Sequence, residues 1–261
     1  MSPLKKITTI GSSKRKQSTL FSYLENPNDA KKDKKNHEHK DKIAQALSRH
    51  FNSEVCNLTE NGKSWYILCK SWLPSKPKEF EIEWNLHPNT RHSLKVYGRI
   101  CQEKRWSQAW GVSYPYSGSI AIARPIHESY MLLTLMQKIN ALMNQLELTG
   151  KDSKPSTYNG CLQNWYGTSD VIGLHSDDER TMDRKYPIFS LSWGGTRRFL
   201  FRSKDPNDKS ITELYLENGD LLIMGGTSQE THKHEVPKVR ITKDPISSDR
   251  INWTIRSFCE K

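Results

Sequence analysis

Short strand-like runs, each bounded by Gly, Pro, Asn or Asp, constrain the fold of this 261-residue chain more than any other feature. They cover residues 162–166, 188–193, 198–202, 211–216, 220–224 and 251–258. So many strands in about 100 residues predict a closed or double-sheet antiparallel β body, such as a jelly roll.

The part of the chain before these strands is predicted to be mixed. Residues 128–148 repeat Met and Leu at helical spacing, which predicts a long helix packed on the core. A short helix is predicted over residues 41–51, and further strands over residues 64–72 and 80–84. Five widely spaced cysteines without a C-x-x-C pair indicate a reduced, intracellular protein.

The beginning of the chain differs from the rest in composition. Residues 1–45 contain eleven Lys or Arg and five acidic residues, which is about half of the net charge of +11. A segment with so few apolar residues cannot offset its ordering entropy, so residues 1–42 are predicted to be a disordered basic tail before a domain at 43–261. The basic excess favours a nucleic-acid partner. The sequence has no apolar run of bilayer length and no signal-like start, so no membrane association is expected.

One motif interrupts this tail at residues 17–24. Gln17, Leu20 and Tyr23 lie three apart, so one tight helical turn would place Leu20 and Tyr23 on one face. The pattern resembles the sliding-clamp (PCNA) binding motif, with Leu24 in place of its second aromatic residue. Clamp binding and an amphipathic tail without a partner remain equal alternatives. The basic cluster at residues 14–16 favours nuclear import.

A His-x-Asp pair carries the first indication of chemistry. His175 and Asp177 lie two apart, so an extended strand would point both side chains to one face. A second imidazole from another strand would complete a 2-His-1-carboxylate triad, which is typical of non-haem Fe(II) oxygenases. Taken alone, such a pair is more often an ordinary surface or hydrogen-bonding pair.

Several segments around this pair carry a family resemblance. Residues 164–194 include Asn-Trp-Tyr, Gly-Leu-His-Ser-Asp-Asp-Glu and Ser-Leu-Ser-Trp-Gly, and residues 216–224 include Glu-Asn-Gly-Asp. His-Glu-Val-Pro follows at 234–237 and Arg-Ile-Asn-Trp-Thr-Ile-Arg at 250–256. In order and spacing the chain resembles the AlkB family of Fe(II)/2-oxoglutarate dioxygenases. The resemblance implies an α+β fold: a double-stranded β-helix (jelly-roll) core at about 158–260, flanking N-terminal helices, and a nucleotide-recognition lid at about 94–120.

The resemblance also implies roles for individual residues. His175, Asp177 and His234 match the iron ligands, and His234 is preferred over His232 because the family's ligand directly precedes a hydrophobic-Pro turn. The planar, always-charged guanidinium groups of two arginines suit the carboxylates of 2-oxoglutarate. The residues that match the co-substrate pocket are Asn164, Tyr166, Arg250, Asn252 and Arg256.

The upstream half resembles the lid of relatives that repair double-stranded DNA. Tyr97 lies where a hydrophobic finger fills the gap left by a flipped base, and an enzyme acting on a base must extrude it from the duplex. Glu179 would favour cationic lesions through the exocyclic amine of the base. The lid aromatics could instead be an edge of the core. The residues expected to bind substrate are Tyr97, Arg105, Trp110, Tyr114, Tyr116, Ser117 and Glu179.

These assignments imply a nuclear, monomeric DNA-repair enzyme that contacts a flipped alkylated base. It would demethylate 1-methyladenine and 3-methylcytosine, preferentially in duplex DNA, using Fe(II), O2 and 2-oxoglutarate and releasing succinate, CO2 and formaldehyde. One alternative keeps the chemistry and acts on RNA or single-stranded nucleic acid. Another is a catalytically silent binding module recruited to the clamp.

Overall fold

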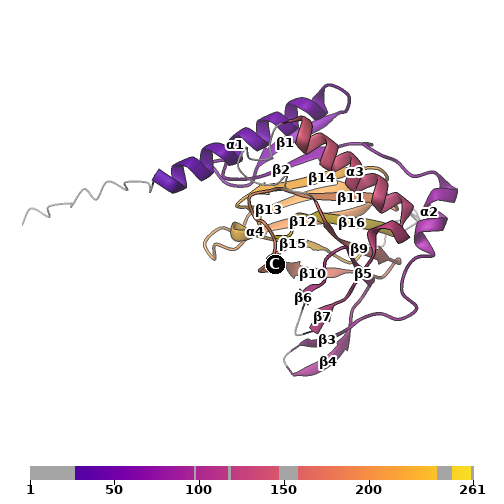
Figure 1. Ribbon diagram of the computed structural model, residues 1–261. Coiled ribbons are helices and arrows are strands. Elements are labelled where there is room, and N and C mark those ends of the chain that lie inside the picture. Colours follow the sequence, from indigo (N-terminus) through magenta and orange to yellow (C-terminus); the bar gives the residue numbers. More distant parts are fainter. Residues whose placement is uncertain (1–26, 97, 117–118, 147–157, 240–248, 260–261) are drawn as a thin grey trace, which may run out of the picture.

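Two β-sheets packed face to face form the body of the protein in the computed structural model, which describes residues 27–96, 98–116, 119–146, 158–239 and 249–259 (Figure 1). Within these residues the larger sheet has eight strands, and its order is β1 (Ser53–Asn57), β2 (Ser64–Cys69), β14 (Leu221–Gly226), β11 (Ile188–Gly194), β16 (Arg250–Arg256), β9 (Gly160–Tyr166), β5 (Trp106–Trp110) and β8 (Ala123–Arg124). The smaller sheet has four described strands in the order β10 (Ile172–His175), β15 (His232–Val236), β12 (Arg197–Ser203) and β13 (Ile211–Leu216). This double-sheet body confirms the predicted jelly-roll core.

Helices cover the outer face of the larger sheet. The covering helices are α1 (Pro27–Ser48) and α3 (Tyr130–Gln145) (Figure 1). The shorter α2 (Pro77–Trp84) lies at the edge of this sheet, and α4 (Ser228–Thr231) lies near the smaller sheet. The 3-10 turn η1 (Ile126–Glu128) leads into α3, where the Ser129 hydroxyl accepts a hydrogen bond from the Leu132 N–H and caps the helix. The predicted core helix at 128–148 is therefore confirmed. Among the described helices, none combines the length and apolar character required to cross a membrane.

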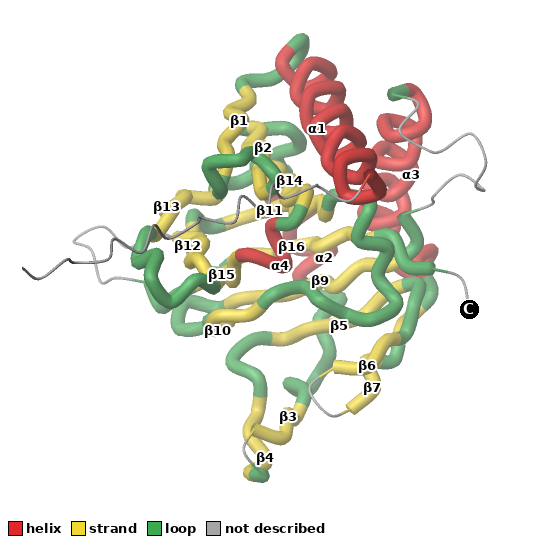
Figure 2. Tube along the Cα trace, turned by 90° about the vertical axis from the view of Figure 1, so that its left-hand side faces the viewer, coloured by secondary structure: helices red, strands yellow, loops and turns green. Residues whose placement is uncertain are grey.

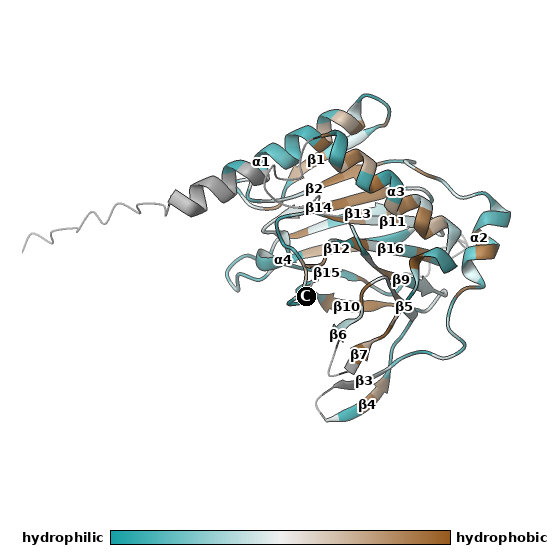
Figure 3. Ribbon diagram, viewed as in Figure 1, coloured by the Kyte–Doolittle hydropathy of each residue, from teal (hydrophilic) through white to brown (hydrophobic). Residues whose placement is uncertain are grey.

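Side chains that alternate along each strand of the larger sheet build two separate cores. In β2, Ile67 faces the layer of α1 and α3, whereas Leu68 faces the smaller sheet. Figure 3 shows hydrophobic residues along the strands beneath the helices, and a mixture of hydrophilic and hydrophobic residues along α1 and α3. The second core lies between the sheets, and the functional groups described below lie at one end of it.

Two predictions about secondary structure are wrong. Residues 27–42 are helical rather than disordered, because α1 continues into Ile43 and Leu47, which are buried against the sheet and anchor the whole helix. His39 is also buried and stacks on Tyr186 at a centroid distance of 6.0 Å. Ordered structure thus begins by Pro27, so the predicted boundary at residue 42 is too late. The clamp-like motif at 17–24 lies outside the described residues.

Residues 80–84 form part of α2 rather than a strand. Pro77 is at the first turn of the helix, and the Lys76 N–H donates to Glu79 Oε2 at 3.0 Å, which is half of a capping box. Phe80 and Trp84 are four residues apart and stack at a centroid distance of 5.7 Å. Their aromatic character suggested a strand, but helical spacing lets both rings pack against the core.

Two hairpins project beyond the sheets at one end of the molecule (Figure 2). They are β3–β4 (Ser93–Val96 and Arg99–Gln102) and β6–β7 (Tyr114–Tyr116 and Ser119–Ala121). Together they occupy most of the predicted lid at 94–120. The hairpins expose apolar side chains, since Ile100 and Ile120 are 80% and 67% exposed.

A buried carboxyl on α2 leads to a prediction about stability. Glu83 accepts hydrogen bonds from Ser129 Oγ at 3.1 and 3.3 Å, and burial raises its pKa above the ordinary value despite these bonds. As pH rises, Glu83 loses its proton at a lower pH in the unfolded chain than in the folded protein. The free energy of unfolding therefore falls between the unfolded-state pKa and the folded-state pKa. Glu83→Gln is therefore expected to gain stability relative to the wild type as pH increases.

The measurement is urea unfolding of both proteins at pH 5 and pH 8. The new amide could donate to the Gln163 Oε1 atom, which is buried and lacks a hydrogen-bond partner among the described residues. Glu81→Gln, an exposed change on the same helix, is the control. The prediction would be contradicted if the difference in free energy of unfolding between the wild type and Glu83→Gln were the same at pH 5 and pH 8.

Candidate active site

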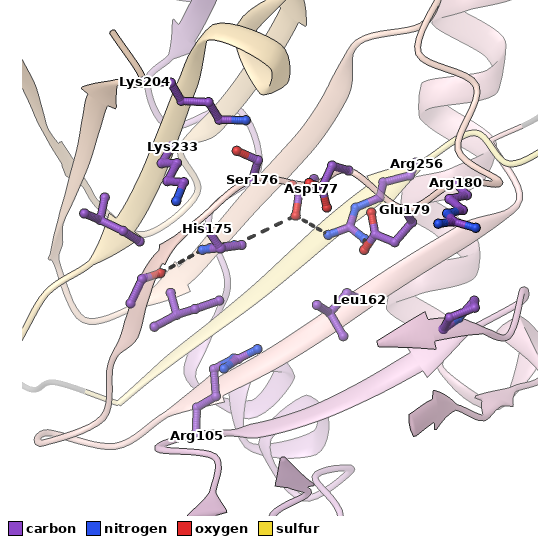
Figure 4. A pocket seen from close by; sticks show the side chains of 15 residues that line it. Arg105, Leu162, His175, Ser176, Asp177, Glu179, Arg180, Lys204, Lys233 and Arg256 are labelled. Atoms are coloured by element: carbon purple, nitrogen blue, oxygen red, sulfur yellow. Dashed lines mark hydrogen bonds and ion pairs between the residues drawn. The ribbon is translucent and has the colours of Figure 1, made fainter. Parts of the chain in front are cut away.

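A cavity of about 840 Å³ opens between the smaller sheet and the projecting hairpins. Its lining includes His175, Asp177, Glu179, Arg256 and Arg105 (Figure 4). These residues come from β10 and the loop after it, from β16, and from the segment before β5. The tertiary structure thus brings together groups that are up to about 150 positions apart in the sequence.

Three side chains form a compact cluster of potential metal ligands. One ligand atom each from His175, Asp177 and His234 lies within 4.8 Å of the other two. The two histidines face each other because β10 and β15 are antiparallel and their register pairs His175 with His234. Each His Nε2 atom lies 3.9 Å from a different carboxylate oxygen of Asp177. The structure brings these three predicted residues to one point.

Electrostatics favour the protonation states that metal binding requires. Burial and the neighbouring His175 lower the pKa of His234 to about 3, and burial also lowers the pKa of His175. Burial would raise the pKa of Asp177, but Arg256 and the two imidazoles outweigh it, so the pKa is lowered. At neutral pH the site therefore presents two neutral imidazoles and one carboxylate.

Neighbouring groups orient these ligands. The His175 Nδ1 atom is 2.9 Å from the carbonyl oxygen of Gly173, so this nitrogen can donate and leave Nε2 as the ligand atom. The Asp177 N–H donates to the side-chain oxygen of Gln229 at 2.9 Å. The ring of Phe199 stacks on His234 at a centroid distance of 5.2 Å. Sequence reasoning missed Gln229, because its place 52 positions after Asp177 gives no signal of contact.

The cluster fits a ferrous ion. Asp177 Oδ2 is buried and accepts no hydrogen bond among the described residues, which suits an atom reserved for a cation. Two imidazoles and one carboxylate are the donor set of non-haem Fe(II) sites. His232 does not belong to the cluster, since its Nδ1 is 2.8 Å from Thr231 Oγ1 and its ring lines a different groove.

The residues expected to hold 2-oxoglutarate line a second cavity that also reaches Asp177 and His234. β9 and β16 are antiparallel, and their register pairs Tyr166 with Arg250 and Asn164 with Asn252. All four side chains, with Arg256, lie along this cavity. The Asn252 amide nitrogen already donates to Ser190 Oγ at 2.8 Å, so Asn252 also ties β16 to β11.

Arg250 is the strongest indication of a carboxylate ligand. It is 1% exposed, and its Nη2 donates to Ser192 Oγ at 2.8 Å, but Nε and Nη1 have no hydrogen-bond partner among the described residues. Burial lowers its pKa to about 10, and its guanidinium carbon lies 5.2 Å from the centroid of the Tyr166 ring. A buried cation with unused donors is costly unless an anion joins it. The site therefore fits one carboxylate of 2-oxoglutarate.

Arg256 connects the metal cluster to the substrate side. Its Nη2 donates to Asp177 Oδ1 at 2.6 Å, and its Nη1 donates to Glu179 Oε1. Burial would lower the pKa of Arg256, but the two carboxylates outweigh it and raise the pKa. Arg256 therefore lines the co-substrate cavity, as the resemblance implies, and it also hydrogen-bonds the candidate metal ligand Asp177.

Apart from Glu179, the predicted substrate residues divide into three groups. Arg105 is buried in the wall of the large cavity, and its Nε donates to Asn164 Oδ1 at 2.6 Å. Trp110 and Tyr114 are both buried, which favours the core-edge alternative over direct contact with a substrate for these two residues. Trp110 belongs to the core beneath the helices, and Tyr114 stacks on Phe258 at 5.5 Å.

The third group is the tip of the lid. Tyr97 and Ser117 lie outside the described residues, and of Tyr116 only the backbone, in β6, is described. Glu179 does line the large cavity, as expected, and it does so while paired with Arg256. Burial raises the pKa of Glu179, and Arg256 only partly offsets that effect.

Comparisons with known proteins agree with this geometry. The sequence profile of the 2OG-Fe(II) oxygenase superfamily matches residues 68–256. Human alpha-ketoglutarate-dependent dioxygenase alkB homolog 3 is 30% identical over 180 residues, which are 62% of this chain and 60% of that protein. Human DNA oxidative demethylase ALKBH2 is 30% identical over 191 residues, which are 69% of this chain and 67% of that protein.

The matched region thus spans about 60% of the length of alkB homolog 3. Among solved structures, "The structure of OsALKBH1" matches with a TM-score of 0.47 and 22% sequence identity, covering 74% of this chain and 96% of that chain. With the superfamily profile matched over most of the chain and the His-Asp-His cluster assembled as described, the protein belongs to the AlkB family of 2-oxoglutarate- and Fe(II)-dependent oxygenases.

Proposed function

We propose that the protein is a dioxygenase that removes N-linked methyl groups from bases of DNA, using Fe(II), O2 and 2-oxoglutarate. The observation that carries the proposal is the placement of Arg250, with its unused donors, in the cavity that also reaches His175, Asp177 and His234. His175 and Asp177 line the large cavity as well, so the cluster lies between the two. The human relative ALKBH2 is described as a DNA oxidative demethylase, which supports DNA as the polymer.

The residues of this chain have separate tasks in that reaction. Iron held by His175, Asp177 and His234 supplies the oxidising chemistry when 2-oxoglutarate and O2 are present. Arg250 holds a carboxylate of 2-oxoglutarate with its unused Nε and Nη1 donors. Arg256 keeps Asp177 ionised and in place. Oxidation of the methyl group gives an N-hydroxymethyl base, which releases formaldehyde.

Glu179 supports a cationic, methylated base as the substrate. Its Oε2 atom is buried and has no hydrogen-bond partner among the described residues, and it lines the cavity in which the base would lie. A carboxylate at this position can accept from an exocyclic amine and attract the positive charge of 1-methyladenine or 3-methylcytosine.

The exposed isoleucines of the two hairpins favour duplex DNA over single strands. Ile100 and Ile120 project from β4 and β7, where apolar side chains could enter the stack as a base leaves it. Tyr97 is the predicted finger of this lid. The alternative is a demethylase of RNA or single-stranded nucleic acid, and Tyr97→Ala is expected to reduce turnover on duplex only.

The test is mass spectrometry of methylated oligonucleotides after incubation with enzyme, Fe(II), ascorbate and 2-oxoglutarate. Matched duplex DNA, single-stranded DNA and RNA are compared, and formaldehyde is measured in parallel. The expected result is demethylation with duplex DNA as the best substrate. Demethylation of RNA alone would establish the alternative polymer. If the protein binds 2-oxoglutarate but demethylates none of the three substrates, the proposal is refuted and a silent binding module is favoured.

Two further predictions concern the cellular setting. Gln17, Leu20 and Tyr23 would bind a PCNA-type clamp, and the basic residues 14–16 would direct the protein to the nucleus. Both predictions, and the monomeric state, rest on the sequence alone.

A further inference from the structure

The large cavity carries positive charge on two opposite rims. Lys204 and Lys233 lie on one side of Asp177 and Arg180 lies on the other (Figure 4). A flipped nucleotide remains attached to its strand through two phosphates, so a site that admits it must accommodate negative charge on both sides of the base. The side with the two lysines carries more positive charge than the side with Arg180 alone.

Lys204 is held in a fixed position relative to the metal ligands. It follows β12, its Nζ donates to the carbonyl oxygen of Gln229 at 2.8 Å, and its N–H donates to the carbonyl oxygen of Thr231 at 2.7 Å. The side chain of the same Gln229 accepts from the Asp177 N–H. One residue therefore ties both the ammonium group and the metal-binding loop.

Lys233 is the second cation on this side of the large cavity. It lies between His232 and His234 on β15 and is exposed, and among the described residues it forms no ion pair. The neighbouring Arg202, which opposes Lys233 in the β12–β15 register, is instead neutralised by Glu235 at 3.1 Å. Ser176 Oγ donates to the carbonyl oxygen of His232 at 2.9 Å, which holds this end of β15 against the metal-binding segment.

An adjoining groove limits where a polyanion could continue. This second groove, of about 950 Å³, shares Lys204 with the large cavity but is also lined by Glu60, Asp205 and Asp208. Its carboxylates would repel phosphates. A strand leaving the large cavity is therefore directed across β15 at Lys233 and not into this groove.

We infer that Lys204 and Lys233 form a binding site for the backbone phosphates next to the base held in the cavity. This inference rests on the proposed function, because it takes nucleic acid as the ligand. Its contribution is independent of base identity: ammonium groups hold the strand, and the cavity selects the base. Lys204→Ala with Lys233→Ala should thus weaken binding to methylated and unmethylated strands alike.

The experiment measures fluorescence anisotropy of a short labelled single-stranded oligodeoxynucleotide bound by the full chain at several KCl concentrations. Each lost phosphate contact on a single strand lowers the magnitude of the salt slope by about 0.7, so the double variant is expected to lose about 1.4. Affinity at low salt should fall on the order of tenfold. The control is Lys138→Ala with Lys209→Ala, which removes the same charge from exposed positions on α3 and in the β12–β13 loop.

The outcomes separate this site from the reaction. A salt slope that is smaller in the double variant but unchanged in the control supports the site. The charge-preserving variant Lys204→Arg with Lys233→Arg should have the salt slope of the wild type. Equal slopes in both variants would overturn the inference, as would wild-type binding to anionic vesicles or an acidic peptide in preference to the oligonucleotide. If the wild type demethylates no substrate but still binds the oligonucleotide with a steeper salt slope than the double variant, the proposed reaction is refuted and the phosphate site is retained.

Discussion

Replacement of His234 by alanine is expected to reduce demethylation by about 1,000-fold, because a ligand lost from a three-residue site leaves the metal without a stable position. His234 is fully enclosed between Phe199 and His175, so solvent cannot readily supply the missing ligand in the same place. Turnover of a methylated oligonucleotide under saturating 2-oxoglutarate is the measurement.

A second readout separates metal loss from unfolding. Mn(II) should raise the melting temperature of the wild type but not of His234→Ala, by linkage between metal binding and folding. His232→Ala is the matched control, since it removes an imidazole two positions earlier on the same strand, outside the cluster. If His232→Ala lost the Mn(II) response and His234→Ala kept it, the assignment of the third ligand would be reversed.

Arg250→Met is expected to stabilise the ligand-free protein while abolishing its response to 2-oxoglutarate. The wild type buries a guanidinium with unused donors, and replacing a buried, poorly paired charge by an apolar side chain is worth about 1–4 kcal/mol of stability. At 100 times its Kd, 2-oxoglutarate should stabilise the wild type by about 2.7 kcal/mol. Loss of a charge-assisted, two-donor contact should raise KM for 2-oxoglutarate on the order of 100-fold.

Thermal or urea unfolding with and without 2-oxoglutarate tests this pair of effects. Arg198→Met is the control, because Arg198 donates to Glu213 at 2.9 and 2.8 Å on the surface of the smaller sheet, away from both cavities. That variant should respond to 2-oxoglutarate as the wild type does. An equal response in Arg250→Met would mean that the co-substrate binds elsewhere.

Strand patterns were the most reliable part of the prediction. The runs at 188–193 and 211–216 coincide with β11 and β13 almost residue for residue, because short strand-forming runs and the turn residues that flank them are local properties of the chain. The helix α1 was underestimated for the opposite reason. Its polar first half is part of a helix that packs on the sheet through Ile43, Leu47 and His39, and these tertiary contacts are not visible in local composition.

The lid aromatics show a second limit of sequence reasoning. Trp110 and Tyr114 have the residue type expected of a base-stacking surface, and composition cannot distinguish a ring that stacks on a ligand from one that fills a core. The structure buries both, one beneath the helices and one against Phe258. The exposed apolar groups of the described lid are instead isoleucines, which carried no signal in the sequence.

The sequence by itself determined the sheet-rich body, the spacing of His175 and Asp177, and the family, because these depend on the order and type of residues along the chain. The tertiary structure brought His234, which the resemblance already preferred over His232, to within reach of His175 and Asp177. It also decided that Arg250 is a buried cation with unused donors and that Arg256 reaches Asp177. Those three facts depend on the register between strands and on what each buried charge meets there, and both arise only when distant segments pack together.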